Sequence, residues 1–518
     1  MTSRRQLLAA TAALATAPVL ARAQIFRHDL AALALPVKQD DTVAQGYRRD
    51  ALVRWGDRVA FDAPGWTPQA PEAEAAAGQF GWDAKVIGLA VPPPAADGVP
   101  RAVLAVAHSN VDATMAFPGG RDLPAVAAAM QGVSLLNLEK RGRWTVVDGG
   151  YQNRRLHGRT LCRISGPGSV TVGSSVQGVL GVQGGCETPW GTLLLAEGGI
   201  TAWGRRLAPL DGRFANPVGF GWVVEMDPFD PQSVPVKRTA LGRLGRGDVA
   251  AALTQDGRAV VFSTDRRAGG HLFRYISAGP AAGGDALDEG TLSVAQMQGN
   301  TLHWRPLPAG AVMNPLDAAR AVNASSFDTP SGLALDKRRP RLLLACRGSG
   351  SRPAGHVLEI SPAGDNVAAD TAAVVLLFAA GDPQTVGAQY GRAGLPAGSA
   401  LVENPDSLAI DGRGRAWVAC DREGVVGAQA DGLFAVDLDG QGRGVPVPIY
   451  GAPRAAGMGG AALTPDGEVL FSAVRHPGAE EGATFARPAT RWPAFEPGVP
   501  PRTTLIGLER SAGGAVGG

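Results

Sequence analysis

The sequence predicts an all-β protein, a single β-propeller that we expect to have six blades, with loop and short-helix insertions. Glycine supplies 71 of the 518 residues, roughly twice its usual share, and proline supplies 39. Short apolar runs recur along the chain and end at Asp-Gly dipeptides. Asp-Gly between apolar runs is typical of a hairpin turn, because glycine accepts a positive φ and aspartate hydrogen-bonds its own backbone. Many short strands with few helical periods favour sheets arranged around an axis.

The individual elements follow from local patterns in chain order. Two short helices are expected over residues 123–136 and 314–322, the first with Pro124 in its first turn, where no N–H is needed. The stretches rich in Gly, Ala and Pro are predicted to be insertions or surface loops: 64–77, 278–289 and 478–501. The turns expected between strands are Asp148-Gly149, Asp256-Gly257, Asp411-Gly412, Asp439-Gly440 and Asp466-Gly467.

The start of the chain has the pattern of an export signal. Arg4 and Arg5 form a twin-arginine pair, an apolar stretch covers residues 7–20, and Ala21-Arg22-Ala23 has the small-x-small form of a cleavage site. We therefore predict a signal peptide at 1–23, a linker at 24–40, the propeller at 41–510 and a flexible tail at 511–518. Such a signal implies the twin-arginine (Tat) export machinery as a partner and a periplasmic or secreted location.

Composition and charge exclude several function classes. The net charge is +2, which gives no basic face for nucleic acid. After residue 20, no apolar run is long enough to span a membrane. Four dispersed cysteines without a CxxC pair suggest neither a disulfide framework nor a zinc site. No Gly-x-Ser-x-Gly, Walker or His-Glu-x-x-His motif is present, which argues against serine hydrolases, nucleotide-dependent enzymes and zincins.

Five motifs lie in collinear order along the chain. They cover residues 100 to 505, and the most specific is Thr188-Pro189-Trp190-Gly191-Thr192. The others are Asn153-Arg154-Arg155-Leu156 with Ser165-Gly166-Pro167; Gly221-Trp222-Val223-Val224-Glu225 with Lys237-Arg238-Thr239-Ala240-Leu241-Gly242-Arg243; Asn404-Pro405-Asp406 with Trp417-Val418; and His476-Pro477-Gly478. Together these motifs resemble those of the PhoX-type alkaline phosphatases. The resemblance implies a β-propeller, and we expect Trp190, Trp222 and Trp417 to pack on its inner strands.

The resemblance also implies a calcium- and iron-containing cluster, held by carboxylates and one cysteine, that hydrolyses phosphate monoesters. Hard cations of this kind take oxygen ligands and can clamp a phosphate. The residues that stand where the resemblance calls for ligands are Ser109, Gln183, Gly198, Gly247 and Ser331. These replacements remove most of the negative charge that such a cluster needs. The sequence therefore predicts a degenerate site without iron.

Three candidate residues remain. Glu197 is the candidate catalytic acid and, with Asp406, a candidate calcium ligand; Cys186 is a candidate replacement for the missing cysteine. Each has a structural alternative: a turn residue paired to arginine for Glu197, a turn residue with local backbone hydrogen bonds for Asp406, and a small buried side chain for Cys186.

Three functions follow as hypotheses. The first is an exported PhoX-like phosphatase with altered ligands. The second is a non-catalytic propeller that binds a partner or a small anionic or phosphorylated molecule. The third is a calcium-dependent lactonase-like hydrolase, because Pro405-Asp406 and residues 409–412 with Trp417-Val418 also resemble gluconolactonase strands. Propellers host many functions, so the fold does not choose among them.

Overall fold

The computed structural model describes residues 29–350 and 352–518. The predicted signal peptide and the first part of the predicted linker lie outside these residues. Within the described part, Leu30 and Leu35 of the predicted linker are buried, and so is Val516 of the predicted tail.

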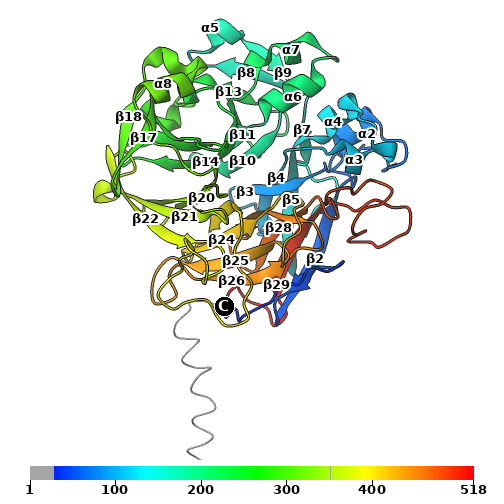
Figure 1. Ribbon diagram of the computed structural model, residues 1–518. Coiled ribbons are helices and arrows are strands. Elements are labelled where there is room, and N and C mark those ends of the chain that lie inside the picture. The colour runs from blue at the N-terminus through cyan, green and yellow to red at the C-terminus, as the bar shows by residue number, and fades with distance from the viewer. Residues whose placement is uncertain (1–28, 351) are drawn as a thin grey trace, which may run out of the picture.

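Strands make up most of the regular secondary structure (Figure 1), and all their pairs are antiparallel except that of β13 with β8. The first sheet holds β3 (Ala84–Ala90), β4 (Arg101–His108), β5 (Gly132–Arg141) and β6 (Arg143–Val146), with β7 (Arg154–Leu156) paired to β5. The second holds β10 (Val182–Glu187), β11 (Leu193–Glu197), β12 (Val223–Met226), β13 (Val236–Arg238), β8 (Leu161–Ser165) and β9 (Ser175–Gln177).

Two groups of strands then merge into one nine-stranded sheet. One group is β14 (Arg246–Leu253), β15 (Arg258–Asp265), β16 (Leu272–Pro280), β17 (Gly290–Gln298) and β18 (Thr301–Pro306). The other is β19 (Pro330–Asp336), β20 (Arg341–Cys346), β21 (His356–Pro362) and β22 (Thr371–Ala379). Strand β18 joins the groups by pairing with β22.

The last two sheets include strands from the start of the chain. One holds β23 (Pro405–Ile410), β24 (Arg415–Cys420), β25 (Gly432–Asp437), β26 (Pro446–Gly451) and β1 (Thr42–Val43). The other holds β27 (Gly457–Leu463), β28 (Val469–Arg475), β29 (Thr504–Arg510) and β2 (Tyr47–Arg54). Because β2 pairs with β29, the two ends of the chain are joined in one sheet.

The sheets surround an axis. The strands β3, β10, β14, β19, β23 and β27 contact one another in cyclic order, and each begins its own group. Apolar clusters fill the spaces between neighbouring groups, as Val53, Val86 and Phe471 do between the first and last sheets. The prediction of an all-β propeller is confirmed. The blade count stays a prediction, because β18 merges two groups into one sheet.

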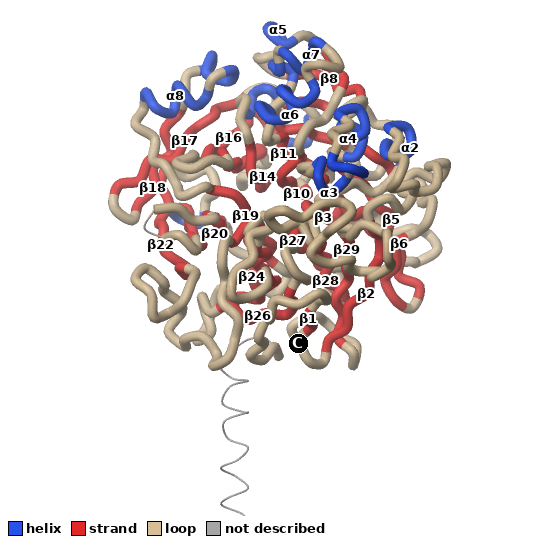
Figure 2. Tube along the Cα trace, turned by 45° about the vertical axis from the view of Figure 1, so that its right-hand side comes forward, coloured by secondary structure: helices blue, strands red, loops and turns tan. Residues whose placement is uncertain are grey.

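Short helices lie at one side of the sheets (Figure 2). They are α2 (Ala73–Gly78), α3 (Ala113–Ala116), α4 (Pro124–Met130), α5 (Ser169–Val172), α6 (Ile200–Leu207), α7 (Gly212–Ala215) and α8 (Pro315–Ala321). Brief 3₁₀ turns also occur, at Pro118–Gly120, Pro217–Gly219, Thr239–Leu241, Ala281–Gly283, Ala309–Met313 and Ala363–Asp365.

The helix expected over residues 123–136 is half right. It begins at Pro124 as predicted but ends at Met130, and β5 starts at Gly132. Gly132 has φ +115°, and a Cβ there would lie 1.9 Å from the carbonyl oxygen of Leu156. The guanidinium of Arg155 donates to the carbonyls that the ended helix leaves open, including that of Met130. A neighbouring strand therefore ends this helix.

The predicted position of the tryptophans is wrong. Trp190 lies in the turn between β10 and β11, Trp222 precedes β12, and Trp417 lies on β24, the second strand of its group. The axis is too crowded for such rings: at Gly184 of inner strand β10, a Cβ would lie 2.2 Å from a carboxylate oxygen of Asp248.

Candidate functional site

Asp406 lies at one end of the propeller axis, enclosed by cations. It is the second residue of inner strand β23, and its side chain is 1% exposed. Its Oδ2 lies 3.2 Å from Lys85 Nζ and 3.7 Å from Arg475 Nη1. Its Oδ1 lies 2.9 Å from Arg266 Nη2 and 3.2 Å from Arg347 Nη1. Four cations thus share one carboxylate.

These cations come from equivalent places in the fold. Lys85 is near the start of inner strand β3, Arg266 and Arg347 directly follow the second strands β15 and β20, and Arg475 ends the second strand β28. In an antiparallel pair the second strand ends beside the start of the first, as Gly457 opposite Arg475 shows. The fold therefore brings residues at the ends of several second strands to the same end of the axis.

The electrostatics at Asp406 follow from this arrangement. Burial by itself would raise the pKa of Asp406, but Lys85, Arg266 and Arg347 outweigh burial and hold the pKa well below its usual value. The carboxylate is therefore ionised, and it compensates cations that have also left water.

A second layer of charges surrounds Arg475. Its guanidinium contacts both carboxylate oxygens of Asp83, at 2.7 and 2.9 Å, and Oδ2 of Asp421 at 2.5 Å. Ser109 donates its hydroxyl to Asp83 at 2.8 Å, and His476 Nε2 lies 3.2 Å from Asp421. Burial would lower the pKa of His476, but Asp421 raises it above the usual value, which favours the protonated form. Ser109, one of the replaced ligand positions, is thus a hydrogen-bond donor in this network.

Asp248 ties three inner strands together further along the axis. Its Oδ1 accepts hydrogen bonds from two backbone N–H groups, that of Gly185 on β10 at 2.9 Å and that of the next residue, Val249 on β14, at 2.9 Å. Its Oδ2 accepts the N–H of Leu333 on β19 at 3.0 Å. Burial raises the pKa of Asp248 to about 6. Asp248 follows Gly247, another replaced ligand position, and its carboxylate serves to join strands.

Glu197 belongs to a separate network inside the second sheet. Its side chain is 0% exposed and lies 2.8 Å from Lys237 Nζ. It also accepts backbone N–H groups of Leu180 and Gly221 at 2.9 Å and of Trp222 at 3.1 Å. Within the described residues, no partner of Glu197 is a partner of Asp406, so the structure does not bring the two predicted ligands into one group. Glu197 is the last residue of β11 and its cation is Lys237, so the alternative prediction of a turn residue paired to arginine is wrong.

Cys186 lies on β10, half-buried against an apolar cluster. Burial raises the pKa of its thiol well above the usual value. Because the thiolate is the form that binds metals, this setting disfavours Cys186 as a ligand. Its proposed role as a replacement ligand stays a prediction.

A cleft of about 830 Å³ opens beside the charge cluster. Four segments line it: residues 423–426 after β24, Arg454 between β26 and β27, residues 479–484 after β28, and the start of α3 with Asp112 and Thr114. Glu423 belongs to both the cleft and the cluster. Its Oε1 lies 2.6 Å from Arg347 Nη1 and 3.2 Å from Arg266 Nη2, and its side chain is 59% exposed.

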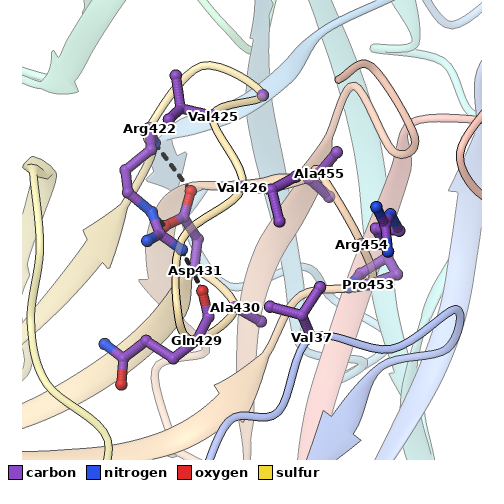
Figure 3. A pocket seen from close by; sticks show the side chains of 12 residues that line it. Val37, Arg422, Val425, Val426, Gln429, Ala430, Asp431, Pro453, Arg454 and Ala455 are labelled. Carbon is purple, nitrogen blue, oxygen red and sulfur yellow. Dashed lines mark hydrogen bonds and ion pairs between the residues drawn. The ribbon is translucent and has the colours of Figure 1, made fainter. Parts of the chain in front are cut away.

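The loop that carries Glu423 is fixed at its base. Arg422 Nε lies 2.6 Å from Asp431 Oδ1 (Figure 3), and its Nη1 lies 2.8 Å from Glu403 Oε2. The side chain of Gln429 hydrogen-bonds the backbone of Leu401. The loop base is held at both ends, while its turn lines the cleft.

Sequence reasoning missed the cations of this site and Glu423. The signal that could have found them is a charged residue directly after a buried apolar strand: Asp265-Arg266, Cys346-Arg347, Cys420-Asp421 and Arg475-His476. An apolar pattern predicts that a strand is buried. That the charges at the strand ends form one cluster follows only from the arrangement of the strands around one axis.

Comparison with known proteins decides the family. Residues 29–478 match the family described as alkaline phosphatase PhoX. This chain belongs to the PhoX alkaline phosphatase family. A structure of Pseudomonas fluorescens PhoX in complex with vanadate, a transition state analogue, matches it with a TM-score of 0.84 at 26% identity, covering 95% of this chain and 100% of that chain.

Two further structures match less well. A gluconolactonase, XC5397 from Xanthomonas campestris, has a TM-score of 0.37 at 13% identity and covers 92% of this chain and 97% of that chain. The calcium-binding protein regucalcin from Agrobacterium tumefaciens has a TM-score of 0.26 at 10% identity and covers 63% of this chain and 90% of that chain. No curated protein sequence matches the chain. The lactonase hypothesis stays a prediction.

The PhoX family is metal-dependent, so we tested whether the residues present fit a metal. Among residues 29–350 and 352–518, no group of three or more His, Cys, Asp or Glu side chains could hold a metal ion. The four cations at Asp406 would repel another. The described residues therefore do not fit a calcium- and iron-containing cluster. In the same part of the chain, no helix is long and apolar enough to cross a membrane.

Proposed function

We propose that this PhoX-family protein binds a small oxyanion, phosphate or a phosphorylated molecule, at the end of its axis and does not hydrolyse phosphate monoesters through a metal cluster. One observation carries the proposal: four cations surround Asp406, a position where the family resemblance calls for a metal ligand. Arginine and lysine are the residues that proteins use to hold phosphate, so these side chains could bind an oxyanion without a metal ion.

The distribution of charge supports an anion. Five basic groups, the four cations with His476, face four acids of the cluster, Asp83, Asp406, Asp421 and Glu423, and the carboxylate of Asp248 also acts on Lys85 further along the axis. Three of the acids are buried, whereas Glu423 is exposed. An anion at Arg266 and Arg347 would therefore meet a positive site near solvent.

Family membership favours a second candidate, hydrolysis of phosphate monoesters with an altered set of ligands. The comparison structure of Pseudomonas fluorescens PhoX is a complex with a transition state analogue, and it covers 95% of this chain. The two candidates differ in what they require: hydrolysis needs a way to activate an attacking oxygen, whereas binding needs only the cations.

Calorimetry with inorganic phosphate tests the proposal on the purified mature protein. We expect Arg347→Gln to weaken phosphate binding at least about tenfold, because a buried charge-assisted contact is lost. Arg305→Gln, at an exposed arginine that contacts only Gln296, is the matched control and should bind like wild type. A chromogenic phosphate ester is then assayed with added calcium and ferric iron. Turnover that depends on these metals, or equal phosphate binding by both variants, contradicts the proposal.

We also propose export through the twin-arginine route to the periplasm or beyond. Family members are typically exported, which supports the expectation from Arg4 and Arg5. Fractionation of cells that express Arg4→Lys/Arg5→Lys should find the protein retained in the cytoplasm; an unchanged distribution contradicts this route.

A further inference from the structure

Glu423 lines the cleft and pairs with two arginines of the charge cluster, Arg266 and Arg347. Arg266 makes both of its acid contacts through Nη2, to Asp406 and to Glu423. Within the described chain, its Nε and Nη1 donate to no protein group, so they remain available to a ligand. Arg347 holds Asp421's carbonyl oxygen with Nη2 at 2.8 Å and places Nη1 between Asp406 and Glu423.

Of the two acids that pair with these arginines, Glu423 is the one that a bound anion could displace. Asp406 is buried on an inner strand, whereas the side chain of Glu423 is 59% exposed in a loop. Glu423 has φ +56°, a left-handed conformation that disfavours a side chain. Its carboxylate contacts are the two arginines, and ion pairs with an exposed partner are weak. An anion can therefore take the place of this carboxylate without disturbing the buried charges.

The cleft beside Glu423 indicates what the anion carries. Val425, 68% exposed, and Val426, 39% exposed, follow Glu423 and line the cleft with Ala479 and Ala483. These apolar groups suit a small apolar substituent. Asp112, Glu480 and Glu481 line the same cleft with one cation, Arg454, which pairs with Glu480 at 2.8 Å, so the lining keeps a net negative charge that disfavours a second anionic group.

Building on the proposed function, we infer that Arg266 and Arg347 bind the single oxyanion group of a small organic ligand whose apolar part lies on Val425 and Val426, and that Glu423 is an internal anion displaced by that ligand. The carboxylate keeps the arginines paired when no ligand is bound. It lowers the apparent affinity by the fraction of molecules in which it occupies the site.

Titration of the full mature protein with phenyl phosphate, followed by calorimetry, tests the inference. Glu423→Gln keeps the size of the side chain but removes its charge, and we expect it to bind phenyl phosphate about five- to tenfold tighter than wild type. Glu481→Gln is the matched control: it removes one exposed acid of the same cleft that has no ion pair, and it should change the affinity less than about twofold. Inorganic phosphate and benzoate, titrated in parallel, separate the apolar contribution from the oxyanion chemistry.

Each outcome is decisive. Tighter binding by Glu423→Gln alone, with phenyl phosphate preferred over inorganic phosphate, supports the inference, and a preference for benzoate assigns the oxyanion as a carboxylate. Equal gains in Glu423→Gln and Glu481→Gln, or no gain in either, overturn the internal anion while leaving anion binding intact. No binding of any probe by wild type or Glu423→Gln overturns the proposed function and the inference together. Thermal unfolding of each variant confirms that it is folded.

Discussion

Two buried carboxylates, Asp406 and Glu197, both pair with cations, but they differ in the number of their cationic partners and in their distance from solvent. Asp406 meets four cations from four other parts of the chain at one end of the axis, next to a cleft. Glu197 meets one lysine and three backbone N–H groups within its own sheet, and its side chain is 0% exposed. Both are candidate metal ligands in the sequence, yet only Asp406 lies where a ligand from solvent could reach its partners.

The difference shows what makes a buried charge functional. Lys237 and the backbone donors satisfy Glu197 completely, so its role is to hold β11, β12 and β13 together. At Asp406 the cations outnumber the carboxylate, and the excess is compensated partly by the exposed Glu423. A charge cluster whose last counter-ion is exposed can exchange that counter-ion for a ligand.

Glu197→Ala is expected to give the largest effect. It leaves Lys237, which is 0% exposed, without a counter-charge, together with three open backbone donors. Breaking a buried pair in this way should lower the free energy of unfolding by about 3–5 kcal/mol, measured by urea unfolding. Glu139→Ala, which breaks a partly exposed pair with Arg101, should cost less than about 1 kcal/mol. If Glu197→Ala cost as little but abolished phosphate binding, Glu197 would belong to the functional site.

Asp406→Asn sharpens the comparison with a smaller loss. Removing this charge should lower the free energy of unfolding by about 2–3 kcal/mol, because four cations lose a shared partner but Arg266 can still be solvated. Phosphate at ten times its Kd should stabilise the wild type and Glu197→Ala alike, by about 1.4 kcal/mol, because both keep the site, and it should stabilise Asp406→Asn by more, because the anion replaces the lost charge and binds tighter. Urea unfolding in phosphate and in chloride at equal ionic strength measures this. An equal gain in all three proteins would show that phosphate does not replace the charge of Asp406.

Asp248→Asn gives the smallest effect, which depends on pH. The folded pKa of Asp248 is about 6, above the unfolded value of about 3.9, so the folded state binds more protons. The wild type should therefore gain stability relative to Asp248→Asn as the pH falls from 7.5 to 4.5, by about 1–3 kcal/mol. Buried histidines with a lowered pKa, such as His108, oppose this gain equally in both proteins. Parallel stability profiles of the two proteins across this range would contradict the assignment.

Local sequence was a good guide to the strands and turns. The predicted turns at Asp256-Gly257 and Asp466-Gly467 join β14 to β15 and β27 to β28, and both glycines have positive φ. Such features depend on neighbouring residues, which the sequence shows directly. The helix over 123–136 ended early because Leu156, distant in sequence, crowds Gly132.

For the site, sequence by itself determined the family resemblance and the candidate Asp406, and it predicted that Ser109 and Gly247 replace ligand-type residues. Only the tertiary structure decided that Asp406 faces four cations and that Glu197 does not share its network. The physical reason is the range of the interactions. Turn chemistry and strand patterning act between neighbours, whereas Lys85 and Asp406 lie 321 residues apart and meet only when the sheets close around one axis.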